Sequence, residues 1–119
     1  MKRTEMRELA FKTIYSRFFN DTETEDSVVD DNLTHKILSC YQANKQEIEN
    51  KIASNLKGYT LERVYKIDLA ILCLAVAEIF YVKENPTEVV INEAVELAKK
   101  YSTEKSPKFI NGVLADIIK

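Results

Sequence analysis

Basic and aromatic side chains gather near both ends of the sequence, where they could bind single-stranded RNA. Residues 1–19 contain five basic and two acidic side chains, and residues 99–108 contain four lysines and one glutamate. Cations bind phosphate groups, and exposed aromatic rings stack on unpaired bases. If the fold brings the two segments together, they form a basic patch on a chain whose net charge is −2. The candidate residues are Lys2, Arg3, Arg7, Tyr15, Lys99, Tyr101, Lys105, Lys108 and Phe109.

Each aromatic ring in this set has an alternative role in the hydrophobic core. Core packing is favoured for Tyr15, which lies on the apolar face of a predicted helix, and it is equally balanced against RNA binding for Tyr101. Phe109 follows Lys108 at the expected exposed start of a helix, which favours contact with a ligand. Residues 20–31 contain six acids and no base, and residues 20–26 are expected to form a solvated loop.

The sequence offers little that could catalyse a reaction. A cysteine–histidine nucleophile would have to pair His35, the only histidine, with Cys40 or Cys73. Cys73 lies in the most apolar stretch and is expected in the core, and Glu78 of the same stretch is expected to be a hydrogen-bonded structural group. Metal-ligand spacings, phosphate-binding glycine loops and paired carboxylates are missing from the sequence. We therefore expect a protein that is not an enzyme and that needs no cofactor and no metal.

Composition favours a single all-α domain over residues 1–119. Of the 119 residues, 45% are hydrophobic and only two are glycine and two proline, which is typical of compact helical proteins. The spacing of apolar residues predicts about seven helical elements. They are 4–19, 27–41, 44–58, a short turn from Thr60, 68–82, 85–101 and 106–118.

The 68–82 segment is apolar nearly all round, so we expect it to be the central helix. It is too short to span a membrane. The isolated cysteines and the lack of a secretory signal predict a cytoplasmic protein with reduced thiols. Helix starts are expected at the caps Asn44, Asn85 and Ser106, with Asp68 either a cap or a first-turn acid.

Three stretches resemble sequence patterns of the NusB family. The C-terminal stretch PTEVVINEAVELAKKYSTEKSPKFINGVLADI (86–117) resembles a proline followed by V-x-INEA-x-ELAK, a short loop and S-x-KF-[IV]-NGVL. DLAILCLAVAEIFY (68–81) is similar to the DxxILRLAxYEL helix, and RELAFKTIY (7–15) is similar to RxxAxxxLY. Cys73 and Ala77 depart from the pattern, where they replace an arginine and a tyrosine.

The resemblance implies a NusB-like fold of two small packed helical subdomains. It also implies a non-catalytic transcription antitermination factor. Such a factor binds boxA RNA of ribosomal RNA operons together with NusE, a small-subunit ribosomal protein, in a complex with RNA polymerase. Ser106, which matches the first residue of S-x-KF, joins the RNA-binding candidates. Asn111 and Gly112 match the NG of the motif and are expected to be structural, because Gly112 would let another backbone approach closely.

Two other functions remain open at this point. The first is a helical protein-interaction adaptor without intrinsic RNA specificity, whose partner-binding residues would be Tyr59, Leu61, Glu62, Tyr65 and Asp68. The second is a fragment of a ribosomal RNA cytosine methyltransferase, whose N-terminal part NusB-like domains resemble. A sequence ending at Lys119 leaves no room for a cofactor-binding sheet, so catalysis is not expected. Monomer and homodimer are both compatible with the sequence.

Overall fold

The computed structural model describes residues 2–19 and 32–119, and it confirms the all-α class. Within these residues there is no β-strand, and five α-helices are found instead of about seven. A 3₁₀ turn, η1 (Leu61–Arg63), precedes the third α-helix, and a π-helical turn, η2 (Glu78–Val82), continues it. The α-helices are α1 (Arg3–Arg17), α2 (Leu33–Ala53), α3 (Lys66–Ala77), α4 (Thr87–Tyr101) and α5 (Ser106–Ile117).

One long kinked helix, α2, replaces two of the predicted helices. Asn44 is not a helix cap, because it lies inside α2 with φ −125° and ψ 22°, where its side-chain amide donates to the Cys40 carbonyl at 2.9 Å. The N-cap of α2 is Asn32, whose side chain accepts the His35 backbone N–H at 2.9 Å. The predicted start at Ser27 lies outside the described residues.

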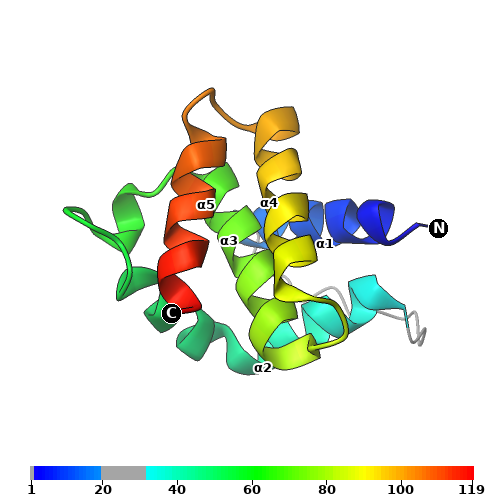
Figure 1. Ribbon diagram of the computed structural model, residues 1–119. Helices are drawn as coiled ribbons and strands as arrows, with labels where there is room; N and C mark the ends of the chain where they lie inside the picture. The colour runs from blue at the N-terminus through cyan, green and yellow to red at the C-terminus, as the bar shows by residue number, and fades with distance from the viewer. Residues whose placement is uncertain (1, 20–31) are drawn as a thin grey trace.

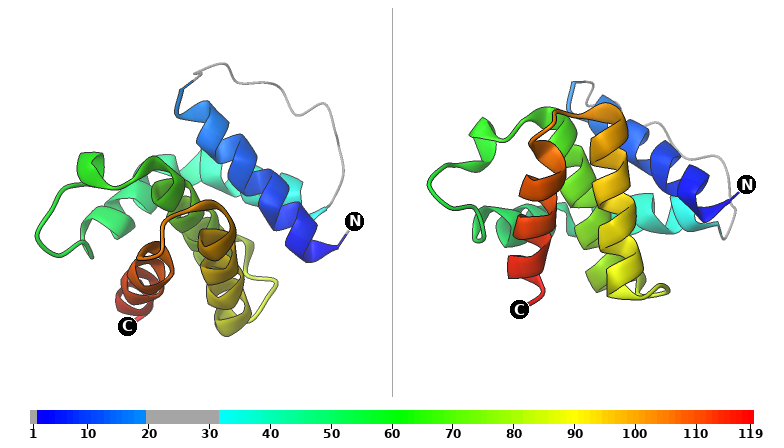
Figure 2. Two further views of the ribbon diagram at one scale, coloured as in Figure 1. Left: turned by 90° about the horizontal axis from the view of Figure 1, so that it is seen from above. Right: turned by 45° about the horizontal axis from the view of Figure 1, so that its top comes forward.

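Helix α3 is the centre of the molecule, as the sequence predicts. Every residue from Asp68 to Ala77 is buried, and α3 packs against the other four α-helices. Helices α1 and α2 lie on one side of α3, and α4 and α5 pack side by side on the other (Figures 1 and 2). The two predicted subdomains therefore share one hydrophobic core built around α3.

Two of the predicted helix caps are wrong because their side chains bond to distant groups instead. Pro86 occupies the cap position of α4, and the Asn85 side chain donates to the Glu78 carboxylate at 2.9 Å. Ser106 begins α5 as its first residue, and its buried hydroxyl donates to Asp68 at 3.0 Å. Asp68 itself lies in the first turn of α3, which was the second of its two expected positions.

The expected close packing at Gly112 is also wrong. Gly112 and Asn111 are both exposed on α5, and a Cβ added to Gly112 would meet nothing within 4 Å. Within the described part of the chain, the Asn111 side chain makes no hydrogen bond. Asn111 and Gly112 therefore lie on a solvent-exposed face of α5 that no other described element covers.

Candidate nucleic-acid interface

A pocket of about 320 Å³ lies where the α4–α5 loop and the start of α5 meet the turn before α3. We call it the corner pocket. The rings of Tyr59 and Phe109 stack at its wall, with centroids 5.9 Å apart and planes 28° apart. It combines predicted RNA-binding residues with predicted partner-binding residues. It is lined by Tyr59, Arg63, Val64, Tyr65, Asp68, Thr103, Lys105, Ser106 and Phe109.

A buried carboxylate holds the corner pocket in shape. Asp68 accepts hydrogen bonds from the Ser102 hydroxyl at 2.5 Å and from the Ser106 hydroxyl at 3.0 Å. Ser106 in turn accepts the Thr103 backbone N–H at 3.2 Å. We call these four residues the Asp68 cluster. Because Ser106 is 2% exposed, it positions the neighbouring Lys105 and Phe109 and is not itself an open contact surface.

A second group of cations surrounds Tyr101, where the end of α4 meets the middle of α1. Glu8 accepts hydrogen bonds from Tyr101 Oη at 2.7 Å and from Lys100 Nζ at 2.9 Å. Lys12 Nζ lies 3.6 Å from the same carboxylate, and the ammonium groups of Lys12 and Lys100 lie 5.5 and 5.3 Å from the Tyr101 ring centroid. The hydrogen bond from Lys100, followed by that from Tyr101, holds the pKa of Glu8 below its ordinary value.

Aromatic rings form a continuous row along α1. Phe11 lies 5.3 Å from Tyr101 and 6.4 Å from Tyr15 between ring centroids, and Tyr15 lies 5.1 Å from Phe19 in an edge-to-face arrangement. Phe11 is buried, while Tyr15 and Tyr101 are partly exposed and pack against the core. Both expected roles of Tyr15 and Tyr101 are therefore compatible with their positions.

The first residues of α1 lie away from the corner pocket. Arg7 is 3% exposed, and it forms a two-pronged ion pair with the fully buried Glu78 at 2.7 and 2.8 Å. This hydrogen bonding raises the pKa of Arg7, and a third bond at 3.1 Å reaches Glu93. Arg3 donates to Asn85 at 2.6 Å. Arg7 is therefore a structural residue whose guanidinium is closed to phosphate, and Glu78 is the hydrogen-bonded structural group that the sequence predicts.

The other candidate lysines are exposed. Lys99 Nζ approaches Glu96 at 3.5 Å, a contact between two solvent-exposed groups. Lys2, Lys105 and Lys108 are exposed and form no ion pair with any other described residue. Of the predicted cations, Lys105 and Lys108 therefore combine freedom from carboxylates with proximity to the corner pocket.

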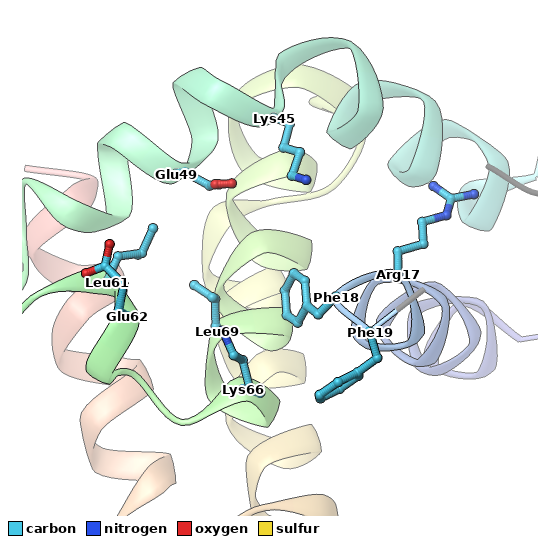
Figure 3. Close-up of a pocket in the computed structure, with 9 residues that line it drawn as sticks. All are labelled: Arg17, Phe18, Phe19, Lys45, Glu49, Leu61, Glu62, Lys66 and Leu69. Atoms are coloured by element: carbon cyan, nitrogen blue, oxygen red, sulfur yellow. The ribbon is translucent and has the colours of Figure 1, made fainter. Parts of the chain in front are cut away.

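A larger pocket of about 430 Å³ lies between the end of α1, the middle of α2 and the segment from η1 to α3 (Figure 3). We call it the Phe19 pocket. Leu61 and Glu62, both predicted as partner-binding, line this pocket and not the corner pocket. The predicted partner-binding set is thus divided between two places. The Phe19 pocket is lined by Arg17, Phe18, Phe19, Lys45, Glu49, Leu61, Glu62, Lys66 and Leu69.

The described residues support neither a metal site nor a reactive thiolate at Cys73. Across residues 2–19 and 32–119, no three His, Cys, Asp or Glu side chains are arranged to hold a metal ion. Cys73 is fully buried, and burial raises the pKa of its thiol, so the nucleophilic thiolate is disfavoured. None of the helices in the described chain has the length and apolar character to cross a membrane.

Comparison with known proteins identifies the family. A sequence model of the NusB family matches residues 4–119. The chain belongs to the NusB family. A transcription antitermination protein NusB from Clostridium novyi (strain NT) is 43% identical over 109 residues, which cover 92% of this chain and 82% of that relative.

Solved NusB structures share the fold. T. maritima NusB has a TM-score of 0.86 and 32% sequence identity, covering 98% of this chain and 90% of its own. A crystal structure of antitermination factors NusB and NusE in complex with dsRNA contains a chain with a TM-score of 0.82 and 26% identity. The match covers 97% of this chain and 94% of that one. The resemblance of the three sequence stretches to the NusB family is thereby confirmed.

The NusB-family motif residues have distinct surroundings in this structure. Phe109 faces the corner pocket, whereas Asn111 and Gly112 are exposed further along α5. Cys73 and Ala77, which replace a family arginine and tyrosine, are both fully buried. Their side chains therefore contribute to the core and contact neither pocket.

Sequence reasoning missed several residues of these surfaces. Lys12 and Lys100 flank Tyr101, and the spacing of Glu8 and Lys12 by four residues was the available signal. Arg63 lines the corner pocket from a 3₁₀ turn whose orientation no periodicity reveals. The cations of the Phe19 pocket come from three separate elements, so no local pattern could have grouped them.

Proposed function

We propose that this protein is a transcription antitermination factor that binds boxA-type single-stranded RNA together with NusE, within an antitermination complex with RNA polymerase. Membership of the NusB family and the solved NusB and NusE complex with dsRNA support this proposal. The observation that carries it is the corner pocket, where the partly exposed Tyr59–Phe109 ring stack lies beside Lys105, which forms no ion pair with another described residue.

The corner pocket suits unstacked bases. Tyr59 is 39% exposed and Tyr65 is 54% exposed, so their rings offer aromatic faces to solvent, and the partly buried Phe109 ring stacks on Tyr59 at the same pocket. Lys105 and Lys108 are exposed on the same loop and helix start, where they would contact the phosphates of the strand. The Asp68 cluster fixes the loop that carries these groups. The Lys12–Tyr101–Lys100 arrangement continues the cationic surface toward α1.

A binding assay with a boxA-like RNA and a scrambled RNA, with and without NusE across salt concentrations, tests the proposal. Phe109→Ala should weaken RNA binding by about 1–3 kcal/mol, because it removes a stacking face. Lys105→Gln should reduce the slope of log affinity against log salt by about 0.7, the value for one phosphate contact on a single strand. Ile118→Ala, an exposed apolar change outside both pockets, is the matched control.

The protein-interaction adaptor is the second candidate, and the exposed rings of Tyr59 and Tyr65 favour it. In that case NusE would bind with full strength, but boxA-like and scrambled RNA would bind equally, even with NusE present. Equal affinities for the two RNAs in the presence of NusE would overturn RNA recognition and leave the adaptor. Light scattering with and without RNA would establish whether one or two copies take part.

A further inference from the structure

We propose that the Phe19 pocket binds one additional nucleotide of the RNA strand, with the base on the Phe19 ring and the phosphate among the cations of the pocket. The inference rests on the proposed function, since it extends the strand beyond the corner pocket and the Tyr101 surface. Its volume of about 430 Å³ falls within the range of about 300–1,000 Å³ typical of small-ligand sites.

The aromatic wall of the pocket is unusually open. Phe19 is 64% exposed, the largest exposed fraction among the large apolar side chains of the described residues. Phe18 lines the same space and points toward Leu69, with Phe19 beside it at the end of α1 (Figure 3). An exposed phenylalanine beside a cavity offers a base a stacking face that is already in place.

The cations of the Phe19 pocket are only partly balanced by the two carboxylates that line it, and none of them forms a close ion pair with a described residue. Arg17, Lys45 and Lys66 form no ion pair with any described residue, whereas Lys12 and Lys100 share the Glu8 carboxylate. Among residues 2–19 and 32–119, the buried Nε of Arg17 has no hydrogen-bond partner, and Lys66 Nζ lies 5.9 Å from the Phe18 ring centroid. A phosphate group beside Lys45 or Lys66 would give that ammonium an anionic partner that no described residue supplies at ion-pair distance.

Two acidic side chains, Glu49 and Glu62, also line the pocket, which leaves an excess of one positive charge. Figure 3 shows Lys45 extending from α2 into the space between Glu49 and Phe18. Carboxylates are compatible with a nucleotide, because they accept hydrogen bonds from exocyclic amino groups of bases. The combination of a ring, uncommitted cations and acceptors therefore fits a base and its phosphate better than a purely apolar peptide.

The Phe19 pocket is continuous with both parts of the proposed interface. On one side, the row of rings from Tyr101 through Tyr15 ends at Phe19. On the other side, Lys66 of this pocket directly follows Tyr65 of the corner pocket at the start of α3. A strand lying on either surface therefore reaches the Phe19 pocket without crossing the core.

An RNA length series tests the proposal. A boxA-like RNA core is compared with the same core extended by two nucleotides at the 5′ end or at the 3′ end, using the full chain with NusE. We expect one of the two extensions to raise affinity by about fivefold to 100-fold, the effect of stacking one base. Phe19→Ala and Lys45→Gln should remove this gain while leaving affinity for the core RNA unchanged.

Matched variants outside the pocket complete the design. Ile118→Ala and Lys83→Gln alter an exposed apolar and an exposed unpaired basic residue that line neither pocket, and they should keep the full gain. An extension gain that survives both pocket variants, or no gain from either extension, overturns the proposal while core binding still supports the proposed function. Loss of NusE binding in Phe19→Ala without RNA would assign the pocket to a protein partner and would also overturn it. Failure of the core RNA to bind overturns both the proposed function and this inference.

Discussion

Two buried polar clusters lie at opposite ends of α3, and they differ in how the charge of the buried carboxylate is balanced. At the C-terminal end, Arg7 and Glu78 neutralise each other inside the protein, with Glu93 and Asn85 completing their hydrogen bonds. At the N-terminal end, the donors to the Asp68 carboxylate within the described part of the chain are two serine hydroxyls.

The difference explains where free cations are found. In the charged cluster, Arg7 joins α1 to η2 from a buried position. Arg7 is therefore not available at the surface to bind phosphate. The Asp68 cluster uses neutral donors to hold the α4–α5 loop, so Lys105 stays unpaired among the described residues. Counting basic residues in a sequence therefore overestimates a phosphate-binding surface wherever an arginine has a buried carboxylate partner.

The largest effect is expected from breaking the charged cluster. Arg7→Met should lower the free energy of unfolding by about 3–5 kcal/mol, because Glu78 is left buried without its counter-charge. Urea denaturation of the variant and of Arg3→Met, which loses only an exposed hydrogen bond, measures this. Replacing both partners, as Arg7→Met with Glu78→Leu, should recover most of the loss. A loss below about 1 kcal/mol in Arg7→Met would contradict this account.

Breaking the Asp68 cluster should lower the free energy of unfolding less than breaking the Arg7–Glu78 pair, but it should have the larger effect on RNA binding. Ser106→Ala removes a donor to Asp68 and should lower the free energy of unfolding by about 1–3 kcal/mol. It should also weaken RNA binding, because the loop carrying Lys105 loses its anchor. Denaturation and RNA titration of Ser106→Ala and Ser102→Ala check this, and the two variants should behave alike. Unchanged RNA affinity in a destabilised Ser106→Ala would separate the Asp68 cluster from the interface.

A pH-dependent contribution of about 0.2–1 kcal/mol is expected from Glu8, which lies between the two clusters. Hydrogen bonds from Lys100 and Tyr101 lower its pKa, so the ionised carboxylate stabilises the folded protein above its ordinary value of 4.5. This stability is lost as the pH falls through the lowered pKa. Glu8→Gln should therefore be less stable than the parent at pH 7 and nearly equal to it at pH 3.

The same variant also tests the Tyr101 surface. Removing the Glu8 charge frees Lys12 and Lys100, so RNA affinity at pH 7 should rise by about twofold to fivefold at low salt. RNA titration at two salt concentrations measures the change, and Glu84→Gln, which releases Lys36 outside both pockets, is the control. Weaker RNA binding by Glu8→Gln would show that the carboxylate itself supports the interface.

An effect comparable in size to that of Glu8 is expected far from both clusters, at the exposed Gly112. Gly112→Ala should raise the free energy of unfolding by about 0.4–1 kcal/mol, because the added Cβ meets open space in an α-helix. Gly58→Ala should lower it, since Gly58 has a φ of +87°. Thermal denaturation of the two variants gives the sign directly. Destabilisation by Gly112→Ala would restore a packing role for that glycine.

The parts of the fold that follow from composition were predictable. A stretch of ten buried residues from 68 to 77 has no polar face, so its central position follows from the sequence alone. The helix count was not predictable, because Asn44 lies at a kink inside α2, where its side chain bonds to the Cys40 carbonyl and the helix continues. Asn85 and Ser106 are good cap residues that instead bond to carboxylates of preceding elements, Asn85 to Glu78 and Ser106 to Asp68.

The candidate site was predictable only where neighbours in sequence are also neighbours in space. Lys105 and Phe109 come from one short segment, and the structure places both at one pocket. The role of Arg7 was misjudged because its partner Glu78 lies 71 residues away in the sequence, and no local pattern indicates that the two residues pair. The grouping of Arg17, Lys45 and Lys66 depends on how three helices meet, which a single sequence does not specify.

The number of residues in the π-helical turn η2 determines the direction of the helices that follow it. The Lys83 N–H donates to the Glu78 carbonyl at 3.0 Å, so this turn holds one residue more than an ordinary α-helical turn. Deleting a single residue here would let α3 continue regularly and would rotate everything after it by about 100° about the helix axis. Asn85 would then swing away from Glu78, and α4 would leave in a different direction. The number of residues in η2 thus sets the direction of α4 and α5 relative to α3.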